Sequence, residues 1–121
     1  MPVVDFNRLF FAANNLRNNA RVGQAIAAYK EIAELANQPD ELKYKAEAWH
    51  LAGVSAKECV LEEGSYYRDA QRYFSQAEAL FRQLGDTESL GALYRDRAII
   101  ADYAGKLIEA EQWYHKSLGV L

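Results

Sequence analysis

The chain has few of the residues that crosslink, interrupt or anchor a protein. Its 121 residues include one cysteine, Cys59, so no intrachain disulfide can form and a cytoplasmic location is expected. The two prolines, Pro2 and Pro39, lie outside the long periodic stretches, which leaves those stretches free to be helical. No apolar run approaches the ~20 residues that span a bilayer. The first residues also lack a basic leader before an apolar run, so neither a membrane span nor a signal peptide is expected.

An excess of positive charge is also missing. The formal net charge is -3, with 26% charged residues, and this argues against a nucleic-acid partner or an anionic membrane surface. Arginines do stand among aromatic doublets such as Tyr73-Phe74, a pattern that could stack on single-stranded nucleic acid. Asp69 and Glu78 interrupt those arginines, so core packing beneath a mixed charged surface is the favoured interpretation.

Residues for catalysis or metal binding do not form a recognisable constellation. His50 and His115 stand alone, and Cys59 lacks a second cysteine for a zinc site, which needs about four ligands. The acidic pairs 40–41 and 62–63 are adjacent on a helix, where side chains point about 100° apart, so they indicate helix-end charges. No phosphate-binding loop or nucleophile motif occurs. The sequence therefore predicts no enzyme activity, no metal and no cofactor.

Periodic apolar residues between short breaks predict an all-α fold. Gly85 and Gly105 are suited to end helices, and Asp86 or Thr87 to begin the next one. Nothing alternates with period two for long enough to indicate a strand. Six helices are expected, at residues 5–19, 22–36, 39–62, 65–84, 87–103 and 106–119.

A small residue followed by an aromatic recurs in the second helix of each expected pair. Ala25, Ala70 and Ala110 are each followed four residues later by an aromatic residue. The three aromatic residues are Tyr29, Phe74 and Tyr114. On a helix, both positions fall on one stripe, where a small residue lets a neighbouring helix approach.

The chain resembles the tetratricopeptide repeat family, whose signature is W-x2-L-G-x2-Y followed by A-x3-F. The matching residues of the second unit are Trp49, Gly53, Ala70, Phe74 and Ala77. Those of the third are Ala98, Gly105, Ala110 and Tyr114. The resemblance implies one domain, residues 1–121, folded as a right-handed α-solenoid of three antiparallel helix pairs. The repeats span about 5–37, 39–84 and 86–121, with a period near 40 instead of the usual 34. An irregular antiparallel bundle is the alternative.

In this family the first helix of each repeat lines a concave groove, and the resemblance implies a peptide-binding site there. The residues carried over are Asn7, Phe10, Asn14, Arg17, Asn18, His50, Val54, Lys57, Arg95, Ile99, Asp102 and Tyr103. One subclass of the family grips the carboxylate of chaperone C-termini. Only Asn14 matches its pattern, so that specificity is rejected.

The predicted function is non-catalytic binding of a peptide or protein segment in this groove. The alternatives are a structural unit that self-assembles through its last helix, and a fragment of a longer repeat scaffold or regulator. The last helix is apolar over more than half its circumference, although solenoids normally end in a polar outer face. A homodimer is therefore expected, and its contact residues are Ile108, Trp113, Tyr114 and Leu118.

Overall fold

A computed structural model describes residues 3–57 and 66–119, all of which lie in helices or short connections. The helices are α1 (Phe6–Asn18), α2 (Val22–Leu35), α3 (Leu42–Lys57), α5 (Tyr66–Leu84), α6 (Thr87–Tyr103) and α7 (Leu107–Gly119), with a 3-10 turn at Pro39–Glu41. No strand occurs in these ranges, which confirms the predicted all-α class. Cys59 and the end of the helix predicted at 39–62 lie outside the described residues.

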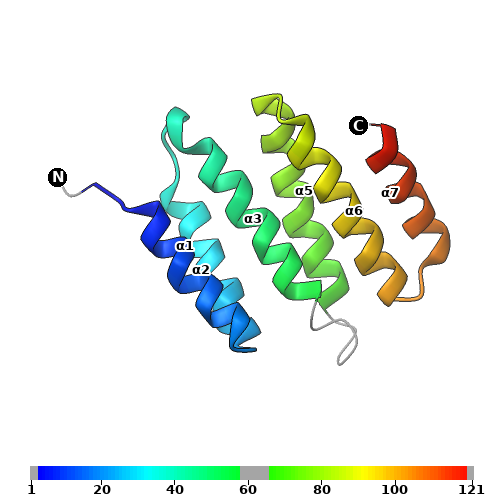
Figure 1. Cartoon of the computed structure of the whole chain (residues 1–121), viewed down its shortest axis with the longest axis horizontal. Helices are drawn as coiled ribbons and strands as arrows, with labels where there is room; N and C mark the ends of the chain where they lie inside the picture. The colour runs from blue at the N-terminus through cyan, green and yellow to red at the C-terminus, as the bar shows by residue number, and fades with distance from the viewer. Residues whose placement is uncertain (1–2, 58–65, 120–121) are drawn as a thin grey trace.

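The helices lie side by side in chain order, from α1 and α2 at one end to α7 at the other (Figure 1). α3 packs against both α2 and α5, and α6 packs against both α5 and α7. The two chain termini lie at opposite ends of this row (Figure 1). Among the described residues, no helix is long and apolar enough to cross a membrane.

Local chemistry sets the helix boundaries close to where the sequence predicts them. The Asp5 carboxylate accepts a hydrogen bond from the Arg8 N–H at 3.1 Å, and the Asp86 carboxylate accepts one from the Ser89 N–H at 3.0 Å. Both side chains satisfy an N–H that has no partner within the helix. The third helix differs from the prediction, because Pro39 begins a 3-10 turn and α3 starts at Leu42.

Three helices end in the same left-handed turn. Ala20, Gly85 and Gly105 follow α1, α5 and α6 with φ of 62°, 68° and 77°. In each turn the N–H of the following residue bonds the carbonyl five positions earlier, at 2.8 to 3.0 Å. Glycine adopts this φ without steric cost, whereas Ala20 does so against its Cβ. The turn at Ala20 thus separates the two helices predicted at 5–19 and 22–36.

The core consists of two clusters that share α3. One contains Phe10 and Tyr29 with other side chains of α1, α2 and α3, and the other contains Phe74 and Tyr94 with side chains of α3, α5 and α6. Trp49 contacts both clusters and stacks on Tyr73 at 5.7 Å between ring centroids. The row of helices is therefore packed continuously rather than divided in two.

The small residues of the repeated pattern lie where helices approach closely. Ala25 and Ala70 are fully buried, and Ala110 is 4% exposed. A Cβ placed on Gly53 would lie 2.5 Å from Cε1 of Phe74, closer than any real contact. Only glycine fits at this point of the α3–α5 contact, so Gly53 lets the two helices approach closely.

Candidate functional site

The first helices of the three pairs, α1, α3 and α6, carry all the side chains predicted to line a groove. The side of these helices that carries the predicted residues is called the groove face. On α1, the exposed residues of this face include Asn7 and Asn18, with Asn14 half-buried. Phe10 differs from the prediction. It is 8% exposed and packs in the core with Tyr29 and Tyr44, so it has little surface left for a ligand.

The aromatic side chain that α1 does expose is Phe11. It is 69% exposed, and helical geometry places it between Asn7, Asn14 and Asn18 on the surface of α1. The sequence-based assignment expected Phe10 at the surface, whereas the structure buries Phe10 and exposes Phe11. Phe11 lies about 160° around the helix from the fully buried Ala13, on the solvent side of α1.

Asn14 is held by the core beneath it. Its side-chain oxygen accepts a hydrogen bond from the Tyr29 hydroxyl of α2. Because the oxygen is engaged, the two donors of the Asn14 amide are the groups that can face a ligand. Tyr29 is fully buried, so this bond sets the orientation of an amide on the groove face.

A cluster of charged side chains joins α3 to α6 in the middle of the groove face. His50 Nε2 lies 2.8 Å from Asp96 Oδ2, and Lys57 Nζ lies 3.6 Å from Asp96 Oδ1. Burial alone would raise the pKa of the Asp96 carboxyl, but the hydrogen bonds and charges of His50 and Lys57 lower it below its usual value. The sequence predicted His50 and Lys57 on this face but not that Asp96 pairs with both.

A shallow cleft opens next to His50, at the end of the groove face where α3 begins. It is lined by Lys43, Tyr44, Glu47, His50, Leu51, Phe81, Asp86 and Ser89. The rings of Phe74 and Phe81 contact His50 edge-on, at 5.9 and 6.0 Å between centroids. His50 is therefore oriented by an apolar floor on one side and by Asp96 on the other.

The remaining predicted groove residues lie along the same helices. Arg17, Val54 and Ile99 are half-buried, whereas Arg95 and Asp102 are exposed and Tyr103 is 49% exposed. Asp102 lies at the edge of the face, where it lines a hollow with residues of α7. The groove face thus combines amide donors, two exposed aromatic rings and charges of both signs.

Three of the four predicted self-association residues are exposed on α7. Ile108 is 77% exposed, Leu118 69% and Tyr114 41%. Trp113 differs, because it is half-buried and stacks on Tyr94 of α6 at 5.7 Å between centroids. Its role is in the packing of α7 onto α6.

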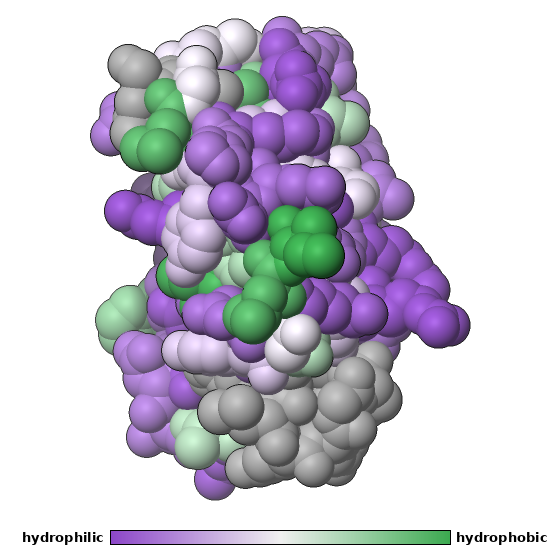
Figure 2. All heavy atoms as spheres, turned by 90° about the vertical axis from the view of Figure 1, so that its right-hand side faces the viewer, coloured by the Kyte–Doolittle hydropathy of each residue, from purple (hydrophilic) through white to green (hydrophobic). Residues whose placement is uncertain are grey.

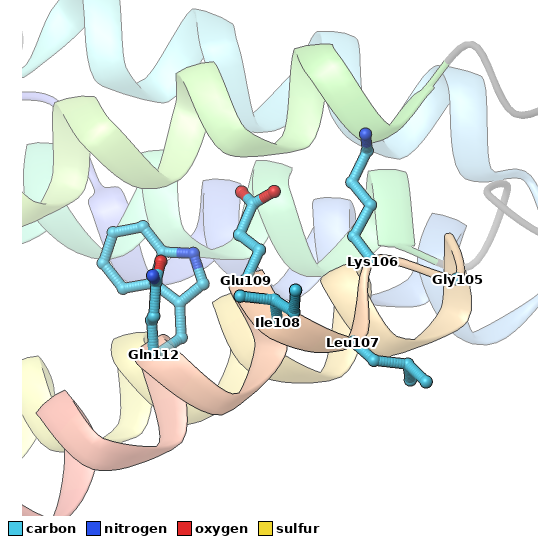
Figure 3. A pocket seen from close by; sticks show the side chains of 7 residues that line it. Gly105, Lys106, Leu107, Ile108, Glu109 and Gln112 are labelled. Atoms are coloured by element: carbon cyan, nitrogen blue, oxygen red, sulfur yellow. The ribbon is translucent and has the colours of Figure 1, made fainter.

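On the side of α7 that faces away from Ile108, Tyr114 and Leu118, polar side chains border a depression toward α5. Lys106 and Glu109 point to this side of the helix, whereas Leu107 points away from it (Figure 3). The Tyr67 hydroxyl and the Trp113 indole N–H are buried nearby without a hydrogen-bond partner among the described residues. Burial raises the pKa of Tyr67 above its usual range, and the neighbouring Glu109 raises it further. The two sides of α7 are therefore chemically unlike.

Metal ligation and similarity to known proteins give no further assignment. No group of three or more His, Cys, Asp or Glu side chains in residues 3–57 and 66–119 is placed to hold a metal ion. No protein-family model, curated protein or solved structure matches the chain.

Proposed function

We propose that the chain is a non-catalytic interaction module that binds an extended peptide or protein segment across the groove face. We also propose that its helix pairs form a right-handed solenoid of the tetratricopeptide type. The buried alanines of the repeated pattern and the contact between Gly53 and Phe74 support this arrangement. The absence of enzyme activity and the cytoplasmic location stay predictions.

The main support for peptide binding is the exposure of Phe11 among amide side chains. A ring that is 69% exposed gains free energy when a ligand covers it, at roughly 25 cal/mol per Å² of apolar area. Asn7 and Asn18 flank it on the same surface of α1, and side-chain amides can bond both the N–H and the C=O of a peptide backbone. This combination suits an extended chain better than a small charged metabolite.

The middle of the groove face favours binding without rearrangement. Asp96 already has His50 and Lys57 as partners, so a ligand that passes over this carboxylate does not need to supply a countercharge. Preorganised side chains lose less entropy on binding than mobile ones. Beyond them, Arg95 and Tyr103 are exposed on α6 and can contact an acidic and an apolar residue of the ligand.

The proposal is tested by selecting a peptide from a random library and measuring its Kd by calorimetry against variants. Phe11→Ser and Arg95→Glu should each weaken binding by about tenfold or more, equal to about 1.4 kcal/mol. Both side chains are exposed, so circular dichroism should show an intact fold. The matched control is Arg72→Glu on α5, which reverses a similarly exposed arginine away from the groove face.

Two results would count against the groove. One is a selected peptide whose affinity responds to Arg72→Glu and to neither groove variant. The other is a library that yields no binder although the chain is folded.

A further inference from the structure

One face of α7 is exposed to solvent. The corresponding face is covered in α2 and α5, the second helices of the two earlier pairs. The aromatic residues of the repeated pattern show the difference: Tyr29 and Phe74 are fully buried, whereas Tyr114 is 41% exposed. α2 is followed by α3 and α5 by α6, and each following helix packs on its predecessor. α7 is described in contact with α6 alone.

The neighbouring positions repeat this difference. Glu111 and Leu118 of α7 correspond to Ile26 and Ala33 of α2, which are buried in the core. The corresponding residues of α5, Gln71 and Glu78, both bind Arg97 of the next helix. Arg97 Nε lies 2.8 Å from the Gln71 side-chain oxygen, and Arg97 Nη1 lies 2.9 Å from a Glu78 carboxylate oxygen. In both earlier pairs, these two positions therefore contact the following helix.

On α7 the same surface faces solvent and is largely apolar. We call it the end face; it consists of Leu107, Ile108, Glu111, Tyr114, His115 and Leu118. Leu107, Ile108 and Leu118 are 67%, 77% and 69% exposed. Figure 2 shows this end of the molecule, where hydrophobic side chains gather among hydrophilic ones.

The α1 end of the row of helices is polar, unlike the end face. The outward side of α1 carries Arg8 and Asn15, both exposed. The matching positions of α6, Leu93 and Ile100, are fully buried. A head-to-tail stack of two chains would bury Arg8 and Asn15 against an end face made mostly of leucine, isoleucine and tyrosine side chains, with Glu111 as its one carboxylate, and burial of incompletely paired polar groups is costly. The apolar end face is therefore a poor match for the polar end and a good match for itself.

The end face can also pair its two polar side chains, Glu111 and His115, when it packs against a second copy of itself. In an antiparallel pair of α7 helices related by a two-fold axis near residues 112 and 113, Leu107 lies opposite Leu118 of the second copy. The same register brings Glu111 next to His115 of the second copy. Within one chain, Glu111 Oε1 and His115 Nε2 are 3.8 Å apart, and both side chains are largely exposed. Isologous contacts of this kind form closed dimers.

We infer that a second copy of this chain covers the end face, through antiparallel packing of α7 against α7. The dimer places the two groove faces in one particle, and linked binding sites raise the overall avidity for a ligand with two segments. The inference does not depend on what the groove face binds.

The test is the solution mass of the 13.7 kDa chain, measured by light scattering from low to high micromolar concentration. The wild type should approach twice the chain mass. Leu118→Glu should raise the dimer dissociation constant at least about tenfold, since a buried carboxylate must be desolvated. Leu84→Glu on α5 is the control, because Leu84 is 41% exposed but lies outside the end face.

An exchange of charge between positions 111 and 115 tests the register of the antiparallel α7 pair. Glu111→Lys should weaken the homodimer, because the new lysine would lie next to His115 of the second copy. His115→Glu should weaken it as well, and mixing the two variants should restore a dimer that contains one copy of each. A monomer at all concentrations, mass that grows beyond the dimer, or equal effects of Leu84→Glu and Leu118→Glu would each overturn the inference.

Discussion

A single methyl group added at Gly53 should destabilise the fold. The new Cβ would lie 2.5, 2.6 and 2.9 Å from three ring carbons of Phe74, which is fully buried. Overpacking of this kind costs about 1–3 kcal/mol. Alanine also favours a helix over glycine by about 0.8–1 kcal/mol, so the net loss for Gly53→Ala is at most about 2 kcal/mol.

Gly23 provides the matched control, because a Cβ there has nothing within 4 Å. Gly23→Ala should be neutral or stabilise by up to about 1 kcal/mol, so the two variants should differ by about 1–3 kcal/mol in the free energy of unfolding. Urea titration followed by circular dichroism measures both values. Equal free energies of unfolding for the two variants would show that α3 and α5 do not approach closely at Gly53. A double variant, Gly53→Ala with Phe74→Leu, should lose less than the sum of the single changes, since the smaller side chain frees the space.

Two further predictions concern charged side chains of α6. Arg97 is 7% exposed and bonded to Glu78, so Arg97→Met should lower the free energy of unfolding by about 3 kcal/mol, measured by urea titration. Arg95 is exposed, and Arg95→Met should change that free energy by less than about 0.5 kcal/mol. Because the folded-state pKa of Asp96 is lowered, the stability it adds should be fully present above its unfolded pKa of about 3.9 and lost as the pH falls through the lower folded value. The difference between wild type and Asp96→Asn should therefore shrink on acidification, and a difference independent of pH would contradict the ion pair with His50.

Sequence patterns predicted the helices because the information for them is local. Apolar periodicity, Asp86 as a cap and Gly85 and Gly105 as stops act within one or two helical turns, and the structure has them where they were expected. The repeated pattern includes both Gly53 and Phe74, but it does not indicate that these two residues contact each other.

The site was less predictable because it depends on contacts between distant residues. His50 and Asp96 are 46 positions apart, and their 2.8 Å contact follows from how α3 lies next to α6. Phe10 and Phe11 are adjacent, so the rotation of α1 about its axis decides which ring is buried. That rotation is set by packing onto Tyr29 and Tyr44, and the sequence alone did not define it.

The most direct test of the proposed function is a map of backbone amide NMR shifts on titration with a selected peptide. The account predicts that shifted amides concentrate in α1, α3 and α6, with Phe11, Asn18, His50 and Arg95 among them. Shifts confined to α2, α5 and α7 would place the ligand on the other side of the helices and contradict the assignment of the groove face.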